Sequence, residues 1–304
     1  MSIAPALSQR ADHRLGARDR RRVVADLVAL TKPRVVLMVL VTTLVGYYIG
    51  LDRVPDWARM LHLAVGTALA AGGTLALNQY WEREVDARMA RTRSRPLPQG
   101  RLAPLEALVF GVAISVIGVG YLAVSVNVLA AVVTGAIVAM YVFVYTPLKL
   151  RTALCTLVGA LPGALPPVIG WVAARDALGA GAWVLFAIMF AWQLPHALAI
   201  AWLYREDYAR GGIRVLPVID PDGTRTERHI AISSVALLVV SLLATPAGIA
   251  GPLYFVTAFA LGAVFVVFGA QQALLPSRTA IRRVLFASLF YLPLILTVLA
   301  VDKR

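Results

Sequence analysis

Cysteine is almost absent from this sequence. Cys155 is the single cysteine among 304 residues, which excludes an intrachain disulfide and any metal site built from several cysteines. It stands inside an apolar run, so the sequence predicts a small buried side chain at this position rather than a reactive thiol.

Charged residues are also scarce. They make up 15% of the chain against 60% for hydrophobic residues, a balance that predicts a polytopic membrane protein rather than two soluble domains. Acidic residues are the rarer kind, 16 against 29 Lys and Arg, which leaves a formal net charge of +13. In a soluble protein this charge would suggest nucleic acid, but here the arginines stand between apolar runs. We expect a lipid bilayer and an anionic substrate as partners, and no nucleic acid.

Apolar runs occupy most of the chain. Nine are long enough for a transmembrane helix, near residues 35–51, 60–81, 105–124, 128–145, 153–174, 182–203, 230–246, 253–270 and 284–301. We expect an all-α bundle of nine transmembrane helices in one domain, residues 30–304. Residues 1–29 lack the apolar core of a signal peptide. They are expected to form a flexible basic tail that ends in a short amphipathic piece at 23–30.

Basic residues are divided unevenly between the two ends of this bundle. With a cytoplasmic N-terminus, the inner segments carry 24 of the 29 Lys and Arg residues. Cytoplasmic loops are enriched in Lys and Arg, so the asymmetry predicts an N-in, C-out topology. It also places the polar segments around Asn78, around Lys149 and after Trp202 on the cytoplasmic side, where they can line one cavity.

The most informative polar segment ends the second apolar run. Asn78, Glu82 and Asp86 recur every four residues, so on a continuous helix they share one face over about 12 Å. Arginines follow directly, at Arg88, Arg91, Arg93 and Arg95. Oxygen ligands followed by guanidinium groups suit a diphosphate bridged by Mg²⁺. The alternative is a polar helix end with a basic loop, which explains the arginines but not the spacing of the acids.

Two further segments carry candidate groups. Tyr145 and Lys149, four residues apart, offer two donors to a leaving diphosphate, although both types are common at membrane interfaces. After the sixth run, Glu206 or Asp207 is a candidate ligand of a second Mg²⁺. Candidate phosphate-binding groups in the same segment are Arg205 and Arg210. The alternative for this segment is an ordinary interfacial loop.

Two remaining polar features have competing explanations. His196 is the histidine placed deepest within an apolar run, and it is either a porphyrin contact or iron ligand, or a packed core histidine. Asp220 and Asp222 flank Pro221 before a glycine, a pattern that predicts a turn rather than a metal site.

Together these motifs resemble the UbiA family of intramembrane prenyltransferases. The family signature N-x-x-x-D/E-x-x-x-D, with R-T-x-x-R-P after it, is matched by Asn78, Glu82, Asp86 and residues 91–96. Its Y-x-x-x-K is matched by Tyr145 and Lys149. Two departures stand out: Glu82 replaces the commoner Asp, and Gly211 stands four residues after Asp207, where many relatives have a second Asp.

Within the family, four stretches resemble the members that act on heme. They lie at residues 30–34, 86–92, 163–171 and 207–218, and the whole resemblance covers residues 30–301. It implies a UbiA-like bundle around a cavity open to the cytoplasm. It also implies transfer of farnesyl from farnesyl diphosphate to a vinyl group of protoheme IX (heme B), with addition of water to give heme O.

The resemblance implies roles for individual residues. Mg²⁺ would be held by Asn78, Glu82, Asp86 and Asp207. The diphosphate would be bound by Arg91, Arg95, Lys149, Arg205 and Arg210, and heme by His196 and Trp171. Tyr145 would be catalytic, stabilising charge on the leaving diphosphate. It further implies an integral protein of a prokaryotic inner membrane, and it leaves open a downstream heme-modifying enzyme as a partner.

Three alternatives to heme farnesylation remain open from the sequence. A prenyltransferase of the same family acting on a quinone precursor or a chlorophyll-type acceptor would keep the same diphosphate site. An anion transporter would also need a basic pocket, but alternating access favours a site near the membrane midplane. A structural role would leave Glu82 and Asp86 dispensable.

Overall fold

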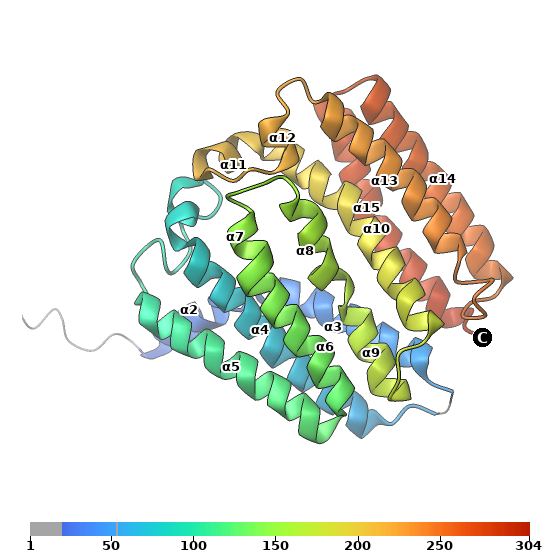
Figure 1. The fold of residues 1–304 in the computed structure, drawn as a ribbon, viewed down its shortest axis with the longest axis horizontal. Coiled ribbons are helices and arrows are strands. Elements are labelled where there is room, and N and C mark those ends of the chain that lie inside the picture. Colours follow the sequence, from blue (N-terminus) through green and yellow to red (C-terminus); the bar gives the residue numbers. More distant parts are fainter. Residues whose placement is uncertain (1–19, 53) are drawn as a thin grey trace, which may run out of the picture.

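The computed structural model describes residues 20–52 and 54–304, and this part of the chain is helical without a β-strand. Figure 1 shows the long helices side by side in one bundle. The elements are α2 (Arg20–Leu30), α3 (Pro33–Gly50), α4 (Trp57–Arg88), α5 (Pro104–Ser125), α6 (Val128–Ala139), the π-helical η2 (Met140–Tyr145), α7 (Thr146–Leu148), α8 (Cys155–Ala164), α9 (Pro166–Arg175), α10 (Ala180–Leu203), α11 (Arg205–Gly211), α12 (Leu216–Ile219), α13 (Thr224–Leu242), α14 (Pro252–Leu274) and α15 (Arg278–Val301). The predicted all-α class is confirmed.

Eight segments of the described chain are long and apolar enough to cross a membrane. Two of them combine shorter elements, because Val128–Leu148 joins α6, η2 and α7, and Cys155–Arg175 joins α8 and α9. The ninth predicted run lies mainly in α13, whose first turns carry charged residues and are less apolar. In the bundle α13 packs against both α10 and α14 (Figure 1). The count of nine transmembrane helices stays a prediction.

Glycines bring two helix pairs into backbone contact. A methyl group at Gly73 of α4 or Gly118 of α5 would overlap atoms of the other helix, and one at Gly170 of α9 would overlap the Thr43 carbonyl of α3. Small residues at helix interfaces allow this close approach, which is stabilised by dispersion. The contacts hold α4 in place, and its last turns carry the polar residues singled out above.

Two prolines interrupt the helical segments. Pro147 follows η2 after one residue, Thr146. A proline lacks the N–H for the carbonyl four residues earlier and its ring crowds that carbonyl, so the preceding turn widens into a π-helix. Pro166 separates α8 from α9 in the same way. Tyr141 and Tyr145 of η2 and Pro166 line one large cavity, so both interruptions lie beside it.

Three polar segments meet at one end of the bundle. The backbone N–H of Arg214 donates to the Lys149 carbonyl (2.8 Å), and that of Ala90 donates to the Asp207 carboxylate (2.7 Å). Figure 1 shows α7, α11 and α12 at the same end as the loop after α4. The predicted convergence is confirmed, while the assignment of this end to the cytoplasm stays a prediction.

Helix α2 lies against the same end. The carbonyl of its last residue, Leu30, accepts a hydrogen bond from Nε2 of Gln79 on α4 (2.7 Å), and Arg101 pairs with Asp26 at 3.0 Å. This helix contains the amphipathic piece predicted at 23–30. Residues 1–19 of the predicted flexible tail lie outside the described residues.

Candidate active site

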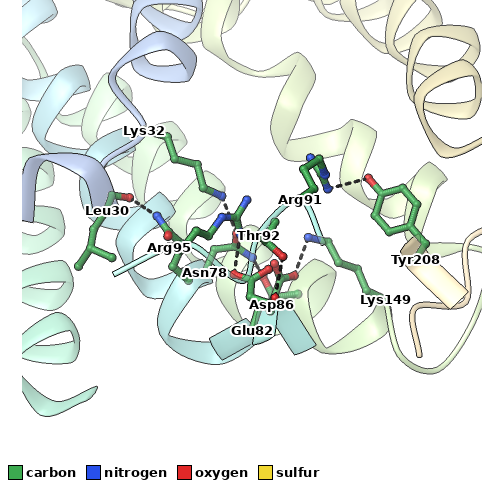
Figure 2. A network of polar contacts seen from close by, with 12 residues as sticks. Leu30, Lys32, Asn78, Glu82, Asp86, Arg91, Thr92, Arg95, Lys149 and Tyr208 are labelled. Carbon is green, nitrogen blue, oxygen red and sulfur yellow. Dashed lines mark hydrogen bonds and ion pairs between the residues drawn. The ribbon is translucent and has the colours of Figure 1, made fainter. Parts of the chain in front are cut away.

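The last three turns of α4 line a polar cavity of about 250 Å³ with Asn78, Glu82 and Asp86. The three side chains share one helix face, as their spacing predicts (Figure 2). Asn78 and Asp86 are each 1% exposed, so they are shielded from bulk solvent by the loops above them. The cavity therefore combines metal-ligand chemistry with a low local dielectric, in which charge interactions are strong.

Each carboxylate of this cavity is paired with a cation from another segment. Lys149 Nζ lies 2.6 Å from Glu82 Oε1, and Arg95 lies 2.5 Å from Asp86 Oδ2 (Figure 2). Burial lowers the pKa of Lys149, but the Glu82 carboxylate outweighs burial and raises it well above its usual value. The other oxygen of Asp86, Oδ1, is buried and has no hydrogen-bond partner within the described residues.

Lys32 is a site residue that the candidate set above does not contain. It stands just before α3 with a left-handed backbone (φ 48°), and its Nζ donates to Asn78 Oδ1 at 3.2 Å. Burial, followed by repulsion from Arg95, lowers the pKa of Lys32 to about 7. The signal in the sequence is a lysine directly before Pro33, but nothing local indicates that its side chain turns into the cavity.

The loop after α4 positions two arginines differently. Thr92 Oγ1 donates to the Asp86 carbonyl (2.9 Å) and folds the chain back, so that Arg95 reaches the carboxylate of the same helix. Arg91 remains exposed at the cavity mouth, over the rings of Tyr204 and Tyr208 at 5.4 and 5.6 Å. Both arginines line the cavity, as predicted.

Tyr145 forms part of the wall between this cavity and a larger one. Lys149 Nζ lies 4.4 Å from its ring centre, and the Tyr141 ring packs edge-on against it at 4.9 Å. Thr146, the next residue and the first of α7, accepts a hydrogen bond from Asn78 Nδ2 (3.1 Å) and thereby ties α7 to α4. The predicted pair Tyr145 and Lys149 therefore lies in the same site as the α4 residues.

Gly159 of α8 allows Tyr145 to occupy this position, because a methyl group there would overlap its ring. We expect Gly159→Ala to displace the ring and lower turnover about 10²-fold, as a shift of about 1 Å can do. Thermal unfolding should change little if the ring moves into the cavity. The matched control is Gly135→Ala, whose new methyl group meets Val119 at 3.8 Å, an ordinary contact. Equal activities of the two variants would contradict this role.

A second, mainly apolar chamber of about 920 Å³ adjoins the polar cavity. Both are lined by Tyr141, Tyr145, Gly159 and Gln193. The chamber wall comes from helices far apart in the sequence, including α3, α4, α10 and α15. Among the lining residues that the structure describes, Arg34 carries the one fixed charge. The arrangement suits a substrate with an ionic head and a long apolar body.

Asp207 lies elsewhere than the prediction placed it. It is not among the residues that line the cavity. Its carboxylate accepts from the backbone N–H groups of Ala90 and Arg91 and from Arg210 (2.7, 3.3 and 2.7 Å). Burial raises the pKa of Asp207, but these donors outweigh it and hold the pKa below its usual value. The side chain holds the loop after α4, and its role as a metal ligand facing Asp86 stays a prediction.

Arg205 and Arg210 also lie apart from the cavity. Arg205 covers the Trp202 ring at 5.2 Å, and Arg210 pairs with Asp207. Neither lines the polar cavity, so the structure does not bring them to the other candidate groups, and their role in binding the diphosphate stays a prediction. The spacing after Trp202 showed a basic loop but could not show which of its arginines point inward.

The two predicted heme contacts are separated in space. His196 lines the apolar chamber. Trp171 of α9 lines neither cavity, and its ring packs near Gly179 and Gly181 and under Arg175 at 5.0 Å. The stretch before Trp171 packs α9 against α3 through Gly170, and the role of Trp171 in binding heme stays a prediction.

Asp220 and Asp222 form the predicted turn. Asp220 accepts hydrogen bonds from the N–H and the hydroxyl of Thr226 (2.7 and 2.8 Å) at the start of α13.

Cys155 is 1% exposed, in agreement with its prediction, and it contributes to the wall of the polar cavity.

Comparison with protein families places most of the chain in one of them. The model of the UbiA prenyltransferase family matches residues 39–292. A protein named protoheme IX farnesyltransferase from Solibacter usitatus (strain Ellin6076) is 47% identical over 287 residues, 91% of this chain and 98% of its own length. A protein of the same name from Anaeromyxobacter sp. (strain Fw109-5) is 42% identical, over 92% of this chain and 94% of its own.

Solved structures with the same fold are much less similar in sequence. A structure described as digeranylgeranylglyceryl phosphate synthase aligns with a TM-score of 0.77 at 16% identity, covering 92% of this chain and 98% of its own. A UbiA homologue from Archaeoglobus fulgidus, solved with DMAPP and Mg²⁺ bound, aligns with a TM-score of 0.65 at 14% identity, covering 91% and 99%.

Proposed function

The chain belongs to the UbiA prenyltransferase family, and we propose that it transfers farnesyl from farnesyl diphosphate to a vinyl group of protoheme IX, giving heme O. The observation that carries the proposal is the junction of a charged cavity with an apolar chamber across Tyr145. Relatives 39–47% identical that are named protoheme IX farnesyltransferase support the choice of acceptor.

The residues of the polar cavity fit a Mg²⁺–diphosphate head. Asp86 Oδ1 is an unpartnered buried oxygen, and Glu82 and the amide oxygen of Asn78 lie on the same helix face. Among the described residues no group of three or more His, Cys, Asp or Glu side chains could hold a metal alone. Mg²⁺ commonly binds one or two carboxylates and completes its shell with substrate phosphate oxygens. When bound, it would neutralise charge on the departing diphosphate.

The cations of the cavity act in the same step. Without substrate, Lys149 and Arg95 neutralise Glu82 and Asp86. With Glu82 and Asp86 holding Mg²⁺, these cations would be free to donate to phosphate oxygens, together with Arg91 at the mouth. Their charge stabilises the negative charge that the leaving diphosphate gains as its bond to the allylic carbon breaks. Lys32, beside Asn78, adds a fourth donor.

The chamber supplies the second half of the reaction. It would hold the farnesyl chain and the porphyrin away from bulk water. Tyr141 and Tyr145 line both cavities, so their rings are suited to stabilise an allylic cation formed between the two. A carbon–carbon bond then joins the farnesyl C1 to the vinyl terminus. One water molecule adds its oxygen to the adjacent cationic carbon and loses a proton. Arg34 at the chamber is suited to the heme carboxylates.

The protein is an integral membrane protein, as its long apolar helices and its family indicate. We place it in a prokaryotic inner membrane with the polar cavity at the cytoplasmic face. Two observations support this orientation. Most Lys and Arg residues lie in the segments predicted to be cytoplasmic, as is usual for cytoplasmic loops, and these loops gather at one end of the bundle (Figure 1).

The direct test uses purified protein in nanodiscs with farnesyl diphosphate, Mg²⁺ and either protoheme IX or aromatic quinone precursors. Mass spectrometry should show protoheme gaining one farnesyl group and one water, and the quinone precursors unchanged. Prenylation of an aromatic precursor without reaction of protoheme would replace this acceptor assignment and leave the diphosphate site intact.

Asp207→Asn separates loop positioning from metal binding. A charge-assisted hydrogen bond contributes about 1.5–3 kcal/mol, and the substitution weakens the bonds that hold the loop carrying Arg91. We therefore expect the KM for farnesyl diphosphate to rise roughly tenfold. The Mg²⁺ concentration for half-maximal rate should stay unchanged. Glu206→Gln, an exposed neighbour with the same charge change, is the control. A large rise in the Mg²⁺ requirement of Asp207→Asn alone would support Asp207 as a ligand.

A further inference from the structure

His196 is held in one orientation within the wall of the apolar chamber. Its Nδ1 lies 2.7 Å from Ser288 Oγ on α15, and its ring stacks on Trp192 at 4.7 Å with an angle of 17°. Trp192 is fixed in turn, because its Nε1 donates to the Ser288 carbonyl (2.8 Å). Ser288 is fully buried, so α15 supports both rings through one residue.

The hydrogen bonds of Ser288 determine which nitrogen of His196 carries the proton. Ser288 Oγ donates its single proton to the Leu285 carbonyl at 2.6 Å, so toward His196 it can only accept. Nδ1 therefore carries the imidazole proton, and Nε2 has a free lone pair. No protein group within the described residues hydrogen-bonds to Nε2, and the residue lines the chamber.

We propose that Nε2 of His196 ligates the iron of the acceptor heme, with Ser288 as the residue that positions it. The inference rests on the proposed function and assigns a binding role within it. A neutral imidazole whose other nitrogen donates to a fixed acceptor is the usual form of a histidine iron ligand. Among the described residues that line the chamber there is no cysteine; the thioethers of Met38 and Met189 are present, but His196 is the one imidazole.

The position of His196 also fits the chemistry at the other cavity. Gln193, three residues earlier on α10, lines both cavities, and three residues advance a helix by about 4.5 Å. A heme bound through His196 therefore has its edge close to the wall at Tyr145. Ligation would select which porphyrin edge, and so which vinyl group, meets the allylic carbon.

The test compares protoheme IX with metal-free protoporphyrin IX, which has the same vinyl and carboxylate groups. In titrations of the protein in nanodiscs, wild type should give the Soret band of imidazole-ligated heme. His196→Ala should lose that band and bind protoheme at least about tenfold more weakly, with protoporphyrin binding unchanged. His196→Gly should regain the band when imidazole is added.

Ser288→Ala should keep the ligated band but weaken protoheme binding about tenfold. Its control is Ser233→Ala on α13, a serine that also bonds to its own helix (2.6 Å to the His229 carbonyl), whereas the hydrogen bond to His196 comes from Ser288. An unchanged Soret band in His196→Ala, or equal weakening for protoheme and protoporphyrin, overturns the proposal. If that happens while wild type still farnesylates protoheme, only the ligand assignment fails and the proposed function stands.

Discussion

An Asp86→Asn variant is expected to have a turnover rate about 10²- to 10³-fold lower than wild type. This is the range seen when one group that stabilises developing charge is removed. The substitution keeps the size of the side chain and removes its negative charge, which pairs with Arg95. It also removes the carboxylate to which Oδ1 belongs, the buried oxygen without a hydrogen-bond partner among the described residues. Formation of farnesylated heme by purified protein, followed by mass spectrometry at saturating substrates, measures the loss.

The control for this experiment lies two residues earlier on the same helix. Glu84 is exposed, and among the described residues it pairs with its neighbour Arg83 alone, at 3.3 Å, so Glu84→Gln makes the same change of charge outside the cavity. It should retain wild-type turnover. If Asp86→Asn also retains it, the metal assignment is wrong and the structural alternative gains support. Flux of a phosphate compound into proteoliposomes without turnover would instead favour the transporter.

Lys149→Met is expected to lower the free energy of unfolding by about 3 kcal/mol, because it leaves the Glu82 carboxylate buried without its partner. The two side chains are only 15% and 12% exposed and lie 2.6 Å apart. The double variant Glu82→Gln/Lys149→Met should recover most of the stability and none of the activity. Thermal unfolding in detergent and the farnesylation assay give the two readouts separately.

An exposed ion pair at the other end of the bundle provides the comparison. Asp52 is 69% exposed and pairs with Arg175 at 2.5 Å, so Asp52→Asn should change stability by less than about 1 kcal/mol and leave turnover intact. If the double variant regains activity along with stability, Glu82 and Lys149 have only a structural role. If Lys149→Met alone is as stable as wild type, the buried pair does not contribute as described.

The local sequence was sufficient for the features that depend on one helix. The four-residue spacing of Asn78, Glu82 and Asp86 requires one shared face on any α-helix, and the structure shows that face lining the cavity. The apolar runs likewise determined the all-α bundle, because a membrane leaves few other ways to satisfy the backbone. For α13, charges in its first turns made the same criterion inconclusive.

The sequence could not decide how side chains from different segments point. Asp207 has the chemistry of a metal ligand, but the N–H groups of Ala90 and Arg91 approach it only after folding. Trp171 follows a motif that resembles heme-directed relatives, but close packing of α9 on α3 holds it away from both cavities. Conversely, Lys32 enters the site through a left-handed backbone turn that no periodicity reveals.

Spacing along the chain therefore determined the helices, the membrane character and the set of acidic and basic groups from which the site is built, because these properties follow from local periodicity and composition. Tertiary structure alone decided which of those groups share a cavity, and it joined that cavity to the apolar chamber. Contacts such as Lys149 with Glu82, or Ser288 with His196, link residues 67 and 92 positions apart, and their geometry depends on how whole helices pack.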